Sequence, residues 1–83
     1  MIFRYRIIMY LRTTDREGGI IDIPARHVQQ VLSIAGISNP TELGESELTT
    51  GQVAALSPLL GFRADVLRYR YHLETLAIDP LRA

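Results

Sequence analysis

Arginine and tyrosine alternate near both ends of the chain, in Phe-Arg-Tyr-Arg at 3–6 and Leu-Arg-Tyr-Arg-Tyr at 67–71. An arginine side chain is a planar cation that binds carboxylate or phosphate through paired hydrogen bonds and stacks on aromatic rings. Tyrosine adds a flat apolar ring with a polar tip. The chemistry that these two runs indicate is recognition of a partner.

Residues suited to catalysis or metal binding occur without the spacing that their chemistry requires. His27 and His72 are the only histidines, and the absence of cysteine excludes disulfides, thiolate catalysis and cysteine-ligated metals. Asp22 and His27 do not have the spacing of two ligands on one helix face. No serine lies in a Gly-x-Ser-x-Gly elbow, and Gly18-Gly19 lacks the remainder of a phosphate-binding loop. We therefore expect no catalytic residues, no metal and no cofactor.

Length and charge narrow the class of protein further. A chain of 83 residues can build one core, so we expect a single domain over 1–83. Nine basic residues, all arginine, balance nine acidic ones, and the zero net charge disfavours nucleic acid as a partner because no global field attracts phosphate. Arg4 interrupts the first apolar run too early for a signal peptide, and no segment approaches the ~20 apolar residues of a membrane span. The sequence predicts a cytoplasmic protein with no membrane partner.

The first pair of arginines belongs to a segment with the two-residue period of a β-strand, from 2 to 13. One face of this strand is apolar and consists of Phe3, Tyr5, Ile7, Met9 and Leu11. The other face consists of Arg4, Arg6, Ile8, Tyr10 and Arg12. A polar stretch at 14–19, which ends in two glycines, predicts a hairpin into a short second strand at 20–23.

Apolar residues at helical spacing follow Pro24 and predict a first helix from about 24 to 35. Gly36 is expected to be its left-handed C-terminal cap. The next segment, 39–44, is typical of a single capped helical turn, with Asn39 as the cap, Pro40 at the first position and Gly44 as the stop.

A second helix is expected to start near Thr50, because Thr49 and Gln52 have the spacing of a capping box. Pro58 is expected to end or bend this helix, since a proline ring crowds the carbonyl four residues before it. The acidic residues Glu42 and Glu45 lie between the two helices together with Glu47. We interpret them as a solvated loop or as a patch that meets the arginine face of another molecule.

Residues 65–77 fit two structures. As a strand, the segment turns Tyr69 and Tyr71 inward and Arg68 and Arg70 outward; as a helix, it starts at Asp65 and aligns an apolar stripe. Tyrosine favours strands, and the helix would leave Tyr71 off the stripe, so we favour the strand. Antiparallel pairing with the first strand avoids stacking like charges, because it places Arg4 and Arg6 near His72 and Glu74.

These elements predict an α+β fold with topology ββααβ. The expected sheet has three antiparallel strands in the order 2-1-3, with both helices packed on its apolar face. The opposite face stays open, and the residues expected to bind a partner are Arg4, Arg6, Ile8, Tyr10, Arg12, Arg68 and Arg70.

Three interpretations of this open face follow from its composition. Arginine and aromatic residues are enriched where protein interfaces are strongest, which favours a small regulatory protein that binds a protein partner or forms a homodimer. The alternative partner is single-stranded nucleic acid, held by phosphate contacts and base stacking. The third interpretation is an ordinary solvated surface whose arginines are neutralised by nearby acids.

Overall fold

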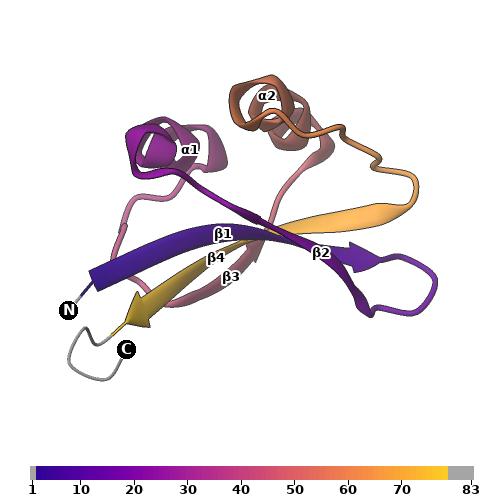
Figure 1. Cartoon of the computed structure of the whole chain (residues 1–83), viewed down its shortest axis with the longest axis horizontal. Helices are drawn as coiled ribbons and strands as arrows, with labels where there is room; N and C mark the ends of the chain where they lie inside the picture. Colours follow the sequence, from indigo (N-terminus) through magenta and orange to yellow (C-terminus); the bar gives the residue numbers. More distant parts are fainter. Residues whose placement is uncertain (1, 79–83) are drawn as a thin grey trace.

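Two long antiparallel strands form the centre of the molecule in the computed structural model, which describes residues 2–78 (Figure 1). They are β1 (Ile2–Leu11) and β4 (Tyr69–Ile78), which pair along their whole length. The register places Arg6 opposite Glu74. The predicted strand at the end of the chain and its antiparallel pairing with the first strand are therefore confirmed, and the helical alternative is wrong.

Each central strand has a second neighbour, so the sheet has four strands in the order β2-β1-β4-β3. β2 (Glu17–Asp22) pairs with β1, and β3 (Gly44–Glu47) pairs with β4. The predicted three-stranded sheet of order 2-1-3 and topology ββααβ is wrong; the topology is ββαβαβ. The α+β class is confirmed.

The strand missed from the sequence, β3, has the polar sequence Gly-Glu-Ser-Glu, and all four residues are exposed. It has no apolar alternation, and its backbone pairing with β4 defines it instead. Asn39 does cap a turn, because its side-chain Oδ1 accepts a hydrogen bond from the Thr41 N–H at 3.2 Å. The chain then enters β3 at Gly44, where a helical turn was expected to stop.

The first helix is α1 (Val28–Ala35), preceded by one 3₁₀ turn at Ala25–His27. Gly36 ends α1 in the left-handed region with φ of 70°, as predicted. The Ile37 N–H donates to the Leu32 carbonyl at 2.9 Å, which completes the usual capping motif of a glycine-terminated helix.

The second helix is α2 (Thr50–Leu60), and the predicted capping box is present. The Gln52 N–H donates to Thr49 Oγ1 at 3.1 Å, and the Thr49 N–H donates to Gln52 Oε1 at 2.8 Å. The helix does not end at Pro58 but continues to Leu60. Pro58 lies in the last turn of α2. Its missing N–H removes one hydrogen bond there, and any bend affects only the two residues that follow.

Both helices cover the same face of the sheet, and the other face has no helix over it (Figure 1). The core lies between the two layers. Its buried residues, from 0% to 8% exposed, are Ile7, Ile23, Val31, Leu32, Leu48, Val53, Leu56, Tyr71 and Leu73. Within residues 2–78, no helix has the length and apolar character needed to cross a membrane.

The hairpin between β1 and β2 contains a bulge at Gly18. Met9 lies opposite Gly19 and Tyr10 opposite Glu17, so Gly18 has no partner on β1. A Cβ atom at Gly18 would lie 2.7 Å from Cε1 of Tyr69. The close approach of the tyrosine ring therefore favours glycine at this position. β2 begins at Glu17, earlier than the predicted 20–23.

Candidate functional site

The sheet surface opposite the helices carries the even-numbered residues of β1 and β4, and we call it the open face. Neighbouring residues of β2 and β3 complete it, because paired residues in a sheet share a face. The open face consists of Ile2, Arg4, Arg6, Ile8, Tyr10, Glu17, Ile20, Asp22, Glu45, Glu47, Arg70, His72, Glu74, Leu76 and Ile78.

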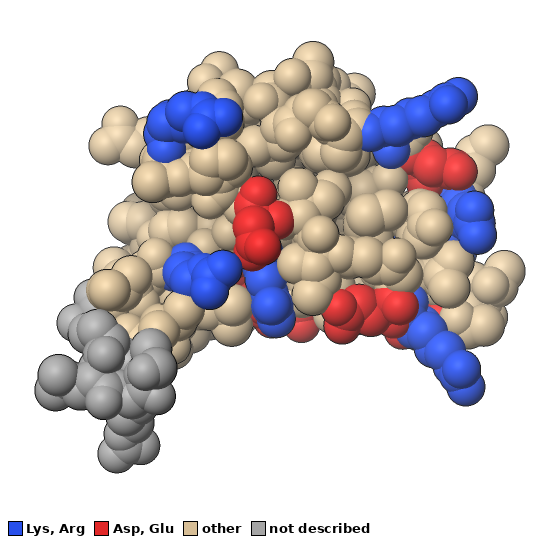
Figure 2. Space-filling model, in the orientation of Figure 1, with Lys and Arg blue, Asp and Glu red and all other residues tan. Residues whose placement is uncertain are grey.

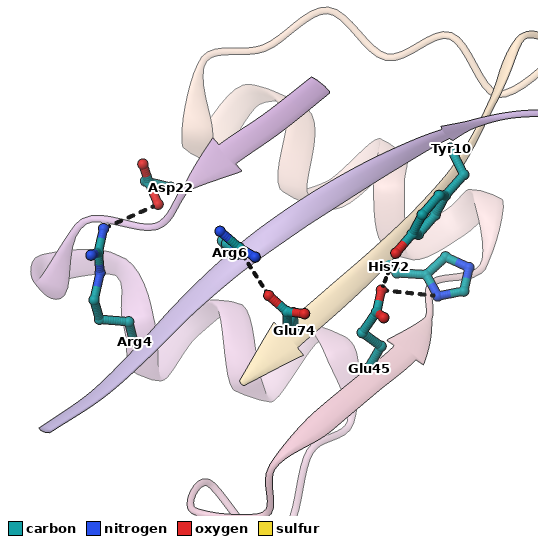
Figure 3. A network of polar contacts seen from close by, with 7 residues as sticks. All are labelled: Arg4, Arg6, Tyr10, Asp22, Glu45, His72 and Glu74. Atoms are coloured by element: carbon teal, nitrogen blue, oxygen red, sulfur yellow. Dashed lines mark hydrogen bonds and ion pairs between the residues drawn. The ribbon is translucent and has the colours of Figure 1, made fainter. Parts of the chain in front are cut away.

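The arginines of the open face are bound to carboxylates of the same chain, and Figure 3 shows the pairs of Arg4 and Arg6. Arg6 Nε donates to Glu74 Oε1 at 2.5 Å, and this hydrogen bond raises the pKa of the Arg6 guanidinium above its ordinary value. Arg4 reaches Asp22 at 3.4 Å. Arg70 forms an ion pair with Asp15 of the hairpin turn. Each guanidinium therefore has an internal counter-ion.

A second group of polar contacts joins β1, β4 and β3 (Figure 3). Tyr10 Oη donates to Glu45 Oε1 at 2.7 Å, and this hydrogen bond raises the pKa of Tyr10 to about 12. His72 lies between two carboxylates, with Nδ1 at 3.9 Å from Glu45 and Nε2 at 3.8 Å from Glu47. The Tyr10 and His72 rings meet edge to face, with centroids 4.9 Å apart. These contacts connect the acidic edge strand to the centre of the sheet.

Ile8 lies in the middle of the open face and is nevertheless only 3% exposed. Its sheet neighbours are Ile20 on β2 and His72 on β4, and no helix covers this face. Neighbouring side chains of the open face, and not a helix, therefore account for its burial. Ile8 offers almost no surface to a partner, whereas Ile20 is 42% exposed.

Two of the predicted partner-binding residues, Arg12 and Arg68, lie apart from the others at the end of the central strands. Arg68 precedes β4 and lies in a turn, with its guanidinium 5.4 Å from the centroid of the Tyr69 ring. Arg12 follows β1, and its Nε donates to the Val66 carbonyl at 2.8 Å. The structure brings together Arg4, Arg6, Ile8, Tyr10 and Arg70 on the open face.

Several residues of the open face were missed because no sequence signal placed them there. Glu45 and Glu47 reach it only through β3, and Asp15 reaches Arg70 only through the hairpin turn. Glu74 was expected near Arg6 from the charge argument, and the register confirms it. Acidic and basic residues are also interspersed on the side of the molecule shown in Figure 2.

Charged groups of the open face contact one another, and apolar and aromatic side chains lie among them. Comparisons with known protein families, with curated proteins and with solved structures found no match to this chain.

Proposed function

We propose that this chain is a small cytoplasmic interaction protein that binds a protein partner through the open face. The observation that carries the proposal is the internal pairing of Arg4, Arg6 and Arg70 with carboxylates. A surface of paired charges beside apolar and aromatic side chains resembles a protein interface more than a polyanion-binding surface.

Fixed side chains make such a surface a better docking site. Binding immobilises interface side chains at a cost of about 0.5–1.5 kcal/mol for each flexible one. Arg6 and Tyr10 are already held by Glu74 and Glu45 in the free protein. Less conformational entropy then remains to be lost when the partner arrives.

The same contacts argue against single-stranded nucleic acid as the partner. A phosphate would have to displace a carboxylate from each arginine to gain an ion pair. It would also approach Glu45, Glu47 and Glu74 on the same face, which repel it. The zero net charge of the chain supplies no compensating long-range attraction.

The proposal can be tested with a substitution at Leu76, which lies opposite Arg4 on the open face. Leu76→Glu removes apolar surface and adds a carboxylate beside a guanidinium, so the fold should be preserved. The matched control is Leu67→Glu, because Leu67 is 90% exposed and lies outside the open face.

A photo-reactive amino acid at position 76 would trap the partner in cells of the source organism, and the purified partner would then be titrated against each protein. We expect Leu76→Glu to weaken binding by about tenfold or more and Leu67→Glu to leave it unchanged. Equal binding by all three proteins would reject the open face. Salt-sensitive binding of a single-stranded oligonucleotide would favour nucleic acid instead.

A further inference from the structure

The outer edge of β3 carries backbone groups that pair with no other strand of residues 2–78, because β3 ends the sheet (Figure 1). The Leu48 N–H donates to the Tyr71 carbonyl at 2.8 Å, and the register of β3 is continuous with this bond. Alternate residues of an antiparallel strand bond to the same neighbour, so Ser46 also bonds to β4. The N–H and C=O groups of Glu45 and Glu47 therefore point outward.

The side chains of the same two glutamates make this edge acidic. Glu45 lies opposite Glu74, and Glu47 lies opposite His72. Within residues 2–78, no arginine forms an ion pair with either glutamate, and their contacts with Tyr10 and His72 use only Oε1. Oε2 of each carboxylate remains available to a cation, and the side chain of Glu47 is 56% exposed.

A hollow of about 150 Å³ adjoins the start of β3 on the side of the helices, and Gly44 and Ser46 lie at its border. Polar and apolar side chains line it, and the apolar ones are Ile37, Leu43 and Leu73. A Cβ atom at Gly44 would meet no atom within 4 Å, so the space beside Gly44 is open. A cavity of this volume holds a small apolar group.

We propose that an extended basic segment of a protein partner adds to the outer edge of β3 as a fifth strand. The added strand is antiparallel, as are all the pairs of this sheet, and has the pattern cation-x-cation-apolar. Its two cations lie opposite Glu47 and Glu45, and its apolar residue lies opposite Gly44, beside the hollow. In this mode of recognition backbone bonds supply affinity, and alternate side chains supply specificity.

Charge excludes other strands from this edge. An acidic segment would place carboxylates opposite Glu45 and Glu47, and a second copy of β3 centred on Ser46 would place these two residues opposite each other. Like charges directly opposite each other are destabilising. The chain's own basic runs, 4–7 and 68–71, contribute to the two central strands, which are paired on both sides. A basic segment of another protein turns the repulsion into attraction.

Strand addition goes beyond the proposed function, because it uses the backbone of the sheet edge, which binding to the open face does not require. It can be tested with a synthetic segment in place of the natural partner. The two proposals can therefore fail separately.

Hydrogen exchange on the ¹⁵N-labelled full chain tests the proposal, with the peptide acetyl-Thr-Arg-Thr-Arg-Leu-Thr-amide as the probe. The N–H groups of Glu45 and Glu47 point away from β4 in the free chain. We expect a saturating concentration of the peptide to slow their exchange by about tenfold or more. The Ser46 N–H already bonds to β4 and should change little.

Modified peptides separate strand pairing from charge attraction. N-methylation of both arginines keeps their charge but removes the N–H groups that bond to β3, so it should abolish the slowing. N-methylation of the threonine between the arginines is the matched control, because that N–H points away from β3, and it should leave binding unchanged. Replacing the leucine by glycine should raise the dissociation constant about fivefold or more, because the hollow is then left unfilled.

Variants of the chain locate the binding edge. Glu47→Arg should weaken peptide binding by about tenfold or more, because it sets like charges opposite each other. The matched control is Glu17→Arg, which makes the same change of net charge on β2, at the opposite edge of the sheet, and should leave binding unchanged. The modified peptides need no variant, so they decide the test even if Glu47→Arg does not fold.

Unchanged exchange of the Glu45 and Glu47 amides at saturating peptide would overturn the proposal. So would equal binding by the peptide with N-methylated arginines, or equal weakening by Glu47→Arg and Glu17→Arg. Leu76→Glu should bind the peptide as wild type does while it loses the protein partner. Failure of the edge site and failure of the proposed function therefore give different results.

Discussion

Truncating the two adjacent isoleucines of β1 tests whether the open face is a packed layer or a loose one. Ile7 faces the helices and is 0% exposed, and Ile8 faces the other way and is 3% exposed. The two residues lie in the same strand, are of the same type and are almost equally buried, and they differ in what covers them. Ile7 lies under two helices, whereas Ile8 lies under the side chains of the open face.

The expected losses follow from the buried atoms. Isoleucine to alanine removes three carbons, and each buried methylene contributes about 0.8 kcal/mol, so the transfer term is about 2.4 kcal/mol at both positions. The rigid core around Ile7 leaves a cavity that brings the total for Ile7→Ala to about 3–4 kcal/mol. The side chains around Ile8 have solvent on their outer side and can shift into the space, so the cavity term is small and we expect about 2.4 kcal/mol for Ile8→Ala. Ile20→Ala, at 42% exposure, should lose about 1 kcal/mol.

Urea unfolding followed by far-ultraviolet circular dichroism measures these differences. A packed open face is supported if the loss of stability is largest for Ile7→Ala, smaller for Ile8→Ala and smallest for Ile20→Ala. A loss below about 0.5 kcal/mol for Ile8→Ala is the value of an ordinary surface substitution. That result would refute the argument that side chains of the open face bury Ile8.

Three further predictions concern single contacts. The raised pKa of Tyr10, about 12 against an ordinary 10, means that its hydrogen bond to Glu45 stabilises the fold below pH 10 and is lost as the pH rises toward 12. Urea unfolding across that window should show wild type losing stability that Tyr10→Phe does not lose. Thr49→Ala should lower the unfolding free energy by about 1 kcal/mol, because it removes the N-terminal cap of α2; an unchanged urea midpoint would contradict this. Gly18→Ala should lower the melting temperature by several degrees, since the new Cβ must displace Tyr69, and an unchanged temperature would mean that the ring moves freely.

The central strands and helix caps could be predicted because their signals are local. The two-residue period of 2–13 and 67–73 determines which residues face the helices, and the charge argument sets Arg6 against Glu74. Gly36 and the Thr49–Gln52 pair have positional preferences that depend only on the adjacent helix.

β3 could not be predicted because nothing in its own residues favours a strand. These four exposed residues form a strand because the free edge of β4 lies beside them. The pairing continues past β3, where the Leu48 N–H donates to the Tyr71 carbonyl at 2.8 Å. The register between β3 and β4 even places Glu45 opposite Glu74, so two negative charges face each other. That repulsion is offset by contacts of the two carboxylates with Tyr10 and Arg6, which come from a distant part of the sequence.

The candidate site, too, could be predicted only as far as its signals are local. Alternation placed Arg4, Arg6, Ile8 and Tyr10 on one face, and the register agrees. It could not show that Ile8 would be covered or that Arg68 would fall in a turn before β4, because strand ends and side-chain packing depend on tertiary context.

Chemical-shift mapping tests the central claim, that a protein partner binds the open face, most directly. The ¹⁵N-labelled chain would be titrated with the trapped and purified partner. We expect the largest amide shifts in β1 and β4 at Arg4, Arg6, Arg70 and Leu76, with little change in α1 and α2. Shifts confined to the outer sides of the helices would contradict the account.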